Sequence, residues 1–174
     1  MTRLLIIVDM QNDFIDGSLA NPDAQAIVKP ICDYVKDFDG DIIFTLDTHQ
    51  DDYLKTSEGK YLPIEHCLRA TKGWAINKDI FNTVQEKETP YYIIEKPTFG
   101  YKDWEKFFEK ASHIDEIVMV GTCTDICVVS NALILKAVFP ETKITVISDL
   151  CAGLTKEKHE AALEVMRSCQ IEIK

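Results

Sequence analysis

The sequence has no hydrophobic run long enough to cross a membrane, and it contains no internal repeat, low-complexity tract or linker. A membrane-spanning helix needs about 20 consecutive apolar residues, which no part of this chain supplies. Intrinsic disorder is also excluded, because 46% of the residues are hydrophobic, as in ordinary globular proteins. We therefore expect one domain over residues 1–174, close to the typical domain size of about 150 residues.

Positive charge is scarce as well. The chain has 19 basic and 29 acidic residues, which gives a net charge of −10. This charge repels nucleic acid phosphates and anionic lipid, so we expect a small-molecule partner, no nucleic acid and no membrane. The short apolar run before Asp9 lacks the length of a signal peptide, and a cytoplasmic location is therefore expected.

Cysteine pairs with Cys-x-x-Cys spacing are absent. The six cysteines fall below the density of disulfide scaffolds, and their spacing disfavours a zinc knuckle or a thioredoxin-type redox pair. We expect free thiols in a reducing compartment, each of which has to be judged singly.

Short apolar runs rich in Ile and Val are present and predict the fold. Their continuous apolar character is typical of strands buried on both faces, as in parallel sheets. The runs lie at residues 4–8, 41–45, 91–94, 116–120 and 143–147, with a possible sixth, edge strand at residues 171–173. Helical patterns between them predict a three-layer α/β/α sandwich, Rossmann-like, around a mainly parallel sheet of about six strands.

The helical patterns have recognisable starts. Asn21 and Pro22 are suited to begin a helix that reaches about Phe38, although Pro30 could kink it. Further helices are expected at residues 103–111 and 125–138, and Thr155 can cap the last one. Residues 47–80 fit the alternation poorly, and long irregular insertions in compact domains are usually functional or mobile.

Polar side chains follow four of the predicted strands, at the edge where ligands bind in open α/β sheets. Asp9 follows the first strand, Lys96 the third and Cys127 the fourth. Cys127 lies in the first turn of a helix, which is expected to lower the pKa of its thiol. Burial of the residue alone would make it a small hydrophobe instead.

A nucleophilic thiol needs a base, and none of the four histidines is obviously placed to serve Cys127. Asp9 is the remaining candidate, because burial would raise its pKa and allow proton transfer near neutral pH. Lys96 could keep Asp9 ionised and stabilise the thiolate. A solvated strand end for Asp9 and a surface salt bridge for Lys96 are the alternative interpretations.

Three motifs in order resemble the isochorismatase-like cysteine hydrolase superfamily. They are VDMQNDF at residues 8–14, KPTFG at residues 96–100 and GTCTDICV at residues 121–128. The resemblance implies that Asp9, Lys96 and Cys127 form a catalytic triad. It also implies a cis peptide between Thr122 and Cys123, an oxyanion hole made by the backbone amides of Cys123 and Cys127, and a Cys123 side chain that only packs.

Asp47-x-His49 supplies two possible metal ligands after the second strand, and His66 could return a third. By itself this pattern would also suit polar loop residues. Nicotinamidases within the superfamily resemble the stretch, and the resemblance implies a divalent metal with Glu58 as a further ligand. Zinc is the expected metal, with iron or manganese as alternatives. Nicotinamidases often have an aromatic residue shortly before this histidine, but the present chain has Leu62-Pro63-Ile64-Glu65 there. The substrate pocket can therefore differ from that of nicotinamidases.

The function implied by the resemblance is hydrolysis of nicotinamide to nicotinate and ammonia through a cysteine thioester. Phe14, Leu19 and Phe99 are candidates for contacts to the substrate ring, with core packing as the alternative. Other small-amide or ureido amidases of the superfamily remain an alternative, and they generally lack the metal pattern. A receiver-like signalling domain or a non-catalytic binding domain is more distant. Relatives often form homo-oligomers, and the same is expected here.

Overall fold

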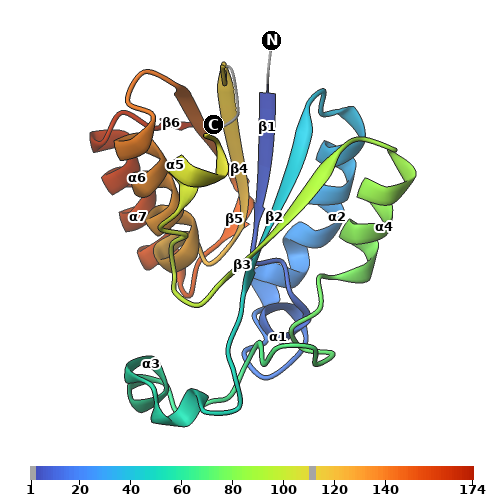
Figure 1. Ribbon diagram of the computed structural model, residues 1–174, viewed down its shortest axis with the longest axis vertical. Coiled ribbons are helices and arrows are strands. Elements are labelled where there is room, and N and C mark those ends of the chain that lie inside the picture. Colours follow the sequence, from blue (N-terminus) through green and yellow to red (C-terminus); the bar gives the residue numbers. More distant parts are fainter. Residues whose placement is uncertain (1–2, 110–112) are drawn as a thin grey trace.

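A computed structural model describes residues 3–109 and 113–174 and contains a six-stranded, wholly parallel sheet (Figure 1). The strand order is β3-β2-β1-β4-β5-β6, which confirms the predicted sheet. The strands are β1 (Arg3–Val8), β2 (Asp41–Asp47), β3 (Tyr91–Lys96), β4 (Glu116–Thr122), β5 (Lys143–Ala152) and β6 (Glu172–Ile173). Because all the strands are parallel, their carboxyl ends lie on one edge of the sheet, where Asp9 follows the central strand β1.

Helices cover both faces of the sheet and complete the predicted three-layer sandwich (Figure 1). On one face lie α2 (Pro22–Asp37) and α4 (Lys78–Glu86), and on the other lie α5 (Trp104–Phe107), α6 (Val129–Val138) and α7 (Lys156–Ser168). The predicted caps are present: the Asn21 side chain accepts from the amide of Asp23, and the Thr155 side chain accepts from the amide of Lys158. Within the described ranges, none of these helices has the length and apolar character needed to span a bilayer.

The continuous apolar pattern of β1 has a direct physical cause. Leu4, Ile6 and Val8 pack under α6 and α7, while Leu5 and Ile7 pack under α2 and α4. All five are buried, and burying a large aliphatic side chain contributes about 1.5–3 kcal/mol. Two hydrophobic cores therefore hold the central strand, and through it the position of Asp9.

Some predicted elements differ from the structure. Helix α4 was not predicted, because only Ile80 and Val84 among its residues are buried. The helix expected at 103–111 contains only Trp104–Phe107, because the aromatic side chains here pack on one another; its predicted end at Ala111 lies outside the described residues. The helix expected at 125–138 begins with a π-helical turn, Thr124–Val128, before α6.

Residues 48–77 cross the carboxyl ends of the strands and project below the sheet in Figure 1. They include the 3₁₀ turn Tyr53–Lys55 and the short helix α3 (Ser57–Tyr61), and the short helix α1 (Asn12–Ile15) lies at the same end. An isolated β-bridge between His49 and Leu68 joins two parts of this segment. A second isolated β-bridge, between Gln11 and Ile76, joins the segment to the residue that precedes α1. The segment thus lies where polar residues leave the sheet.

Candidate active site

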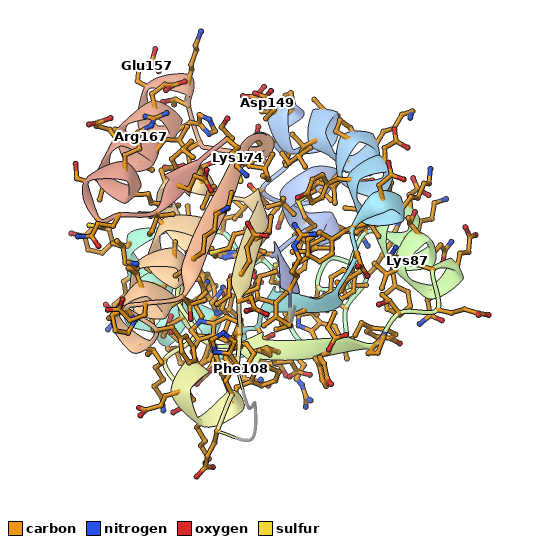
Figure 2. All side chains as sticks on the ribbon, turned by 90° about the horizontal axis from the view of Figure 1, so that it is seen from above. Lys87, Phe108, Asp149, Glu157, Arg167 and Lys174 are labelled. Atoms are coloured by element: carbon orange, nitrogen blue, oxygen red, sulfur yellow. The ribbon has the colours of Figure 1, made fainter. Side chains whose placement is uncertain are left out.

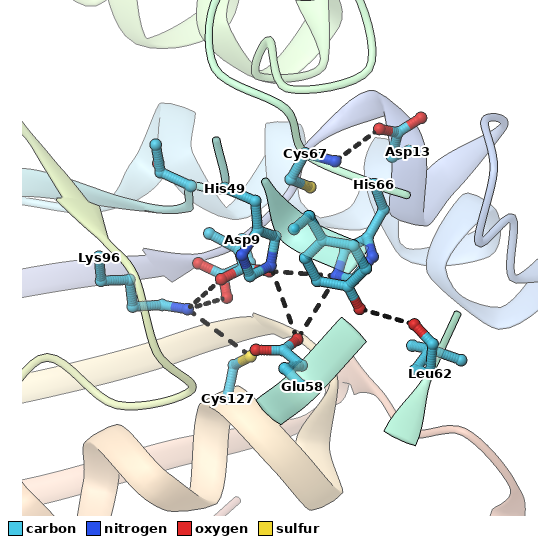
Figure 3. A network of polar contacts seen from close by, with 12 residues as sticks. Asp9, Asp13, His49, Glu58, Leu62, His66, Cys67, Lys96 and Cys127 are labelled. Atoms are coloured by element: carbon cyan, nitrogen blue, oxygen red, sulfur yellow. Dashed lines mark hydrogen bonds and ion pairs between the residues drawn. The ribbon is translucent and has the colours of Figure 1, made fainter. Parts of the chain in front are cut away.

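Asp9, Lys96 and Cys127 meet at the carboxyl edge of the sheet, and we call them the Asp–Lys–Cys cluster (Figure 3). The Nζ of Lys96 lies 2.6 Å from Asp9 Oδ2 and 3.7 Å from Cys127 Sγ. All three residues are buried. Lys96 ends β3 and reaches past β2 to Asp9, which follows β1. The sheet therefore brings together three residues that are far apart in the sequence.

The carboxylate of Asp9 is held in one orientation. Thr45, which lies on β2, donates a hydrogen bond from its hydroxyl to Asp9 Oδ1 at 2.7 Å. The backbone of Asp9 has φ of 48°, in the left-handed region that Asp tolerates better than most residues. Burial raises the pKa of Asp9, and the neighbouring Lys96 ammonium opposes that rise. The result is a carboxylate whose proton affinity is higher than that of a solvated aspartate.

The protonation of Cys127 differs from the sequence-based prediction. Burial raises the pKa of the thiol well above its usual value, the Asp9 carboxylate raises it further, and only Lys96 lowers it. The prediction of a lowered pKa from the helix start was therefore wrong, because desolvation outweighs the helix dipole. Burial would lower the pKa of Lys96, but Asp9 and the other anionic groups raise it, so the ammonium stays charged. The resting cluster is a thiol hydrogen-bonded to a carboxylate that a lysine neutralises.

The turn that holds Cys127 is closely tied to its surroundings. The Thr122–Cys123 peptide is cis, as the resemblance implies. The hydroxyl of Thr124 lies 2.8 Å from Nδ1 of His159 on α7, and Asp125 Oδ1 accepts from the amide of Leu154 at 2.9 Å. These contacts fix the turn against the last helix. The oxyanion-hole role of the Cys123 and Cys127 amides stays a prediction.

The second group of predicted residues also comes together, and we call it the His–carboxylate cluster: Asp47, His49, Glu58 and His66. Its ligand atoms all lie within 4.8 Å of one another. Asp47 Oδ2 is 3.0 Å from His49 Nε2 and 3.5 Å from His66 Nε2. Glu58 Oε1 is 3.6 Å and 3.7 Å from the same two nitrogens. Lys55, in the neighbourhood where many relatives have a histidine ligand, is exposed and outside the cluster.

These donors fit a divalent metal. Two ligand atoms that each lie about 2.1 Å from one divalent ion are at most about 4.2 Å apart, and the four separations given for the His–carboxylate cluster are all shorter than this. Nδ1 of His66 lies 2.8 Å from the Ile64 carbonyl; donation to that oxygen leaves Nε2 free to face the cluster. Asp47 Oδ1 is a buried oxygen without a hydrogen-bond partner among the described residues. Lys96 Nζ lies 3.7 Å from this oxygen and compensates part of its charge, and a cation between the two carboxylates would compensate the charge that remains.

The pKa shifts in the His–carboxylate cluster also favour a bound cation. Burial and the nearby Asp47 raise the pKa of Glu58. Burial would raise the pKa of Asp47 too, but hydrogen bonds from His49 and His66, together with Lys96, lower it overall. Burial would lower the pKa of His66, yet its carboxylate neighbours raise it. Two carboxylates therefore share a partly desolvated space in which protons or cations are favoured.

Three supporting residues were not identified from the sequence. Gln11 is buried, donates to the carbonyl oxygens of Asp47 and Trp74, and accepts from the amide of Asp47. Tyr53 packs its ring on both histidines of the cluster and donates to the Leu62 carbonyl at 2.9 Å. Asn131 holds the turn after β4. The position of Gln11 two residues after Asp9 was a usable signal, whereas nothing in the sequence marked Tyr53.

A cavity of about 500 Å³ opens between the two clusters. Cys127, Asp47, Glu58 and His66 line it, and so does the side chain of Cys123, whose pKa burial raises to about 11. The three predicted ring contacts, Phe14, Leu19 and Phe99, also line it. Lining residues that the sequence did not indicate are Ser18, Ala20, Asn21, Pro22, Leu62, Ile126 and Leu154. The candidate nucleophile Cys127 and a possible metal site thus face one mainly apolar space of the size that small molecules occupy.

The fold and the site define a three-layer α/β/α protein with a candidate cysteine nucleophile at the carboxyl edge of its sheet, and comparison with known proteins gives the family. Residues 3–173 match the isochorismatase domain, so the chain belongs to the isochorismatase family. The family match excludes the receiver-like alternative.

Similar proteins include well-described enzymes. The nicotinamidase/pyrazinamidase of Mycobacterium tuberculosis is 30% identical, over 98% of this chain and 97% of that protein. The pyrazinamidase/nicotinamidase structure from Streptococcus mutans has a TM-score of 0.85 at 26% identity, covering 99% of this chain and 100% of the other. A pyrazinamidase of Pyrococcus horikoshii in complex with zinc has a TM-score of 0.77 at 24% identity, covering 100% and 99%.

Proposed function

We propose that this protein is a nicotinamidase that hydrolyses nicotinamide to nicotinate and ammonia, with Cys127 as the nucleophile and zinc in the His–carboxylate cluster. The observation behind the proposal is the buried Lys96 between Asp9 and Cys127, beside a cavity that also reaches Asp47 and His66. Relatives of similar length named nicotinamidase/pyrazinamidase support the substrate class. The zinc complex of a structural neighbour supports the metal.

Substrate binding uses the apolar walls of the cavity. Phe14 and Phe99 would contact the faces or edge of the pyridine ring, and Leu19 would exclude water beside them. Asp47, His49, Glu58 and His66 would hold the metal, which would supply a Lewis acid for the ring nitrogen. The nucleophile and the ring-binding groups thus act on opposite ends of the substrate.

Acylation follows from the protonation states of the Asp–Lys–Cys cluster. Asp9 accepts the thiol proton as Cys127 Sγ forms a bond to the carboxamide carbon, and Lys96 stabilises the charge that appears on sulfur. The amides of Cys123 and Cys127 would donate to the oxyanion. Asp9 then gives its proton to the leaving nitrogen, ammonia departs, and a thioester remains.

Deacylation repeats the same proton transfers with water. Asp9 takes a proton from a water molecule whose oxygen attacks the thioester carbon, and nicotinic acid forms as the carbon–sulfur bond breaks and loses its carboxyl proton to solvent as nicotinate leaves. The proton returns to Cys127. The raised pKa of Asp9 suits both steps, because a solvated aspartate is too weak a base for a thiol of high pKa.

The test is ammonia release from nicotinamide, pyrazinamide and a ureido compound, with metal analysis of the same protein. Nicotinamide turnover that needs bound metal supports the proposal. Turnover of the ureido compound alone, in metal-free protein, would identify the chain as another amidase of the family. Full activity on nicotinamide in metal-free protein would reject the ring-anchoring role of the metal.

We further propose a homo-oligomer located in the cytoplasm. The edge strand β3 exposes Tyr91, Tyr92 and Ile93, which is unusual for a monomer. All six cysteines are free thiols, which a reducing compartment maintains. Sedimentation of the purified protein tests the first point, and fractionation of the cells that express it tests the second.

A further inference from the structure

Asn131 makes an unusual set of contacts between two segments of the active site. Its side chain is completely buried on α6, and both its oxygen and its nitrogen have two partners. Oδ1 accepts from the amide of Tyr101 at 2.9 Å and from the indole of Trp104 at 3.0 Å. Nδ2 donates to the carbonyl of Cys127 at 2.8 Å and to the carbonyl of Phe99 at 3.2 Å. Two donors face one atom and two acceptors face the other, so the orientation of the amide is fixed chemically.

The two carbonyls belong to the two sides of the cavity. Cys127 lies in the turn Thr124–Val128, and Phe99 lies in the loop that follows Lys96. The Phe99 side chain is 45% exposed while it lines the cavity, so core packing does not hold it. The hydrogen bond from Asn131 to the Phe99 carbonyl therefore contributes more to the position of Phe99 than side-chain packing does.

The same loop is packed tightly on α6 at the next residue. A Cβ added at Gly100 would lie 2.5 Å from Ile134 Cδ1 and 3.3 Å from Ser130 Cβ. A larger residue at position 100 would have to displace the Ile134 side chain, so the glycine favours this close approach, which lies next to the hydrogen bond between the Phe99 carbonyl and Asn131. Two independent features thus hold the Phe99 loop against the helix that follows Cys127.

We propose that Asn131 is a positioning residue that sets both the Cys127 turn and the Phe99 wall of the cavity, and so couples the nucleophile to ring binding. The inference rests on the proposed function for its kinetic readout. The contact to Cys127 acts on kcat, because it orients the turn that presents the sulfur. The contact to Phe99 acts on KM, because it places a wall that the ring touches.

Two nearly isosteric variants separate the contacts. In Asn131→Thr the hydroxyl can donate to the carbonyl of the residue four positions earlier, which is Cys127, but it cannot also reach Phe99. In Asn131→Val both contacts are lost. We expect Asn131→Val to lower kcat about tenfold and to raise KM, and Asn131→Thr to restore kcat to within about threefold while KM stays raised.

Controls distinguish positioning from general stability. Trp104→Phe removes one donor to Asn131 Oδ1 and replaces the buried indole by a smaller aromatic ring, so it should lower the melting temperature while kcat and KM stay near wild type. In a Phe99→Ala background, Asn131→Thr should raise KM no further, because the wall that it positions is absent. Equal kcat in the Val and Thr variants, or kinetic losses in Trp104→Phe as large as in Asn131→Val, would overturn the inference.

A readout without nicotinamide keeps this inference separate from the proposed function. The alkylation rate of Cys127 by iodoacetamide, followed by mass spectrometry, depends on the turn and on Lys96 but not on the natural substrate. We expect the rate to fall about fivefold or more in Asn131→Val and to recover in Asn131→Thr. If wild-type protein does not hydrolyse nicotinamide but this contrast holds, the proposed function fails and the positioning role stands. Equal rates in the two variants contradict the positioning role.

Discussion

The two sides of the cavity are built in different ways. The Asp–Lys–Cys cluster comes from the ends of β1 and β3 and from the turn after β4, so the sheet register determines its geometry. In the His–carboxylate cluster only Asp47 belongs to a strand, and the other three residues lie in the segment 48–77 below the sheet (Figure 1). Under the proposed function, the sheet register positions the nucleophile and the base, whereas the segment 48–77 positions three of the groups that would hold the metal.

The surroundings of the two sides differ as well. Seen from above, the helices α2 and α4 lie on one side of the sheet and α7, which carries Glu157 and Arg167, lies on the other, with the strands between them (Figure 2). Lys96 and Asp9 lie at the carboxyl edge of that layer and are completely buried, whereas Glu58 is partly open to solvent. Loss of a charged residue should therefore affect stability more on the first side than on the second.

The largest effect is expected for Cys127→Ala. Without the sulfur no thioester can form, so ammonia release should fall about a thousandfold or more while the melting temperature changes little. Steady-state ammonia assays and a thermal melt measure the two quantities. Substantial turnover by the folded variant would mean that the Asp–Lys–Cys cluster does not supply the nucleophile.

A large loss of stability is expected for Lys96→Met. The substitution leaves the buried Asp9 carboxylate without its ammonium partner, and removal of one member of a buried ion pair costs about 3–5 kcal/mol. Denaturant unfolding near neutral pH measures the loss. A matched control is Arg69→Met, which removes an exposed partner of Glu95 and should cost about 1 kcal/mol or less. Similar losses in the two variants would contradict the difference between buried and exposed charge.

An intermediate effect is expected on the other side of the cavity. His66→Ala should weaken zinc binding about 10- to 100-fold or more and raise KM for nicotinamide more than it lowers kcat. Isothermal titration of zinc and steady-state kinetics measure these changes. Because the segment 48–77 is outside the sheet, the metal-free melting temperature should fall by only a few degrees. A pure kcat effect would place the metal in the chemical step instead.

The smallest effect is expected for Thr45→Val, and it is a shift in pH. Asp9 must be ionised to accept the thiol proton, so kcat/KM rises with pH through its pKa, which burial places above the usual 3.8. Loss of the hydroxyl donor removes stabilisation of the carboxylate, and the pKa rises further. The acid limb of the profile should move about one unit or less toward higher pH. Movement toward lower pH would exclude Asp9 as the base.

Much of the fold could be predicted because its signals are local. Strands such as β1 are apolar along their whole length, since both faces are buried, and the residues after them could be assigned to one edge. Helix α4 was missed because only two of its residues are buried. The extent of α5 was overestimated because its aromatic side chains stabilise a compact cluster more than a helix.

The site was predictable in its parts and not in its electrostatics. A motif indicated Cys127 as the candidate nucleophile. The direction in which its pKa shifts depends on burial, which the sequence does not reveal. Asn131 was not identified because its importance comes from a loop 32 residues away in the chain. The position of Glu58 relative to His66 likewise depends on the path of residues 48–77, which has no regular period.

The most direct test is a crystal structure of the zinc-loaded protein with pyridine-3-carbaldehyde, which can bond to a thiol but cannot lose ammonia. The account predicts a covalent bond from Cys127 Sγ to the aldehyde carbon, with the oxygen at the amides of Cys123 and Cys127. The ring nitrogen should then face Asp47 and His66. A bond to any other nucleophile, or a ring whose nitrogen points away from the His–carboxylate cluster, would contradict it.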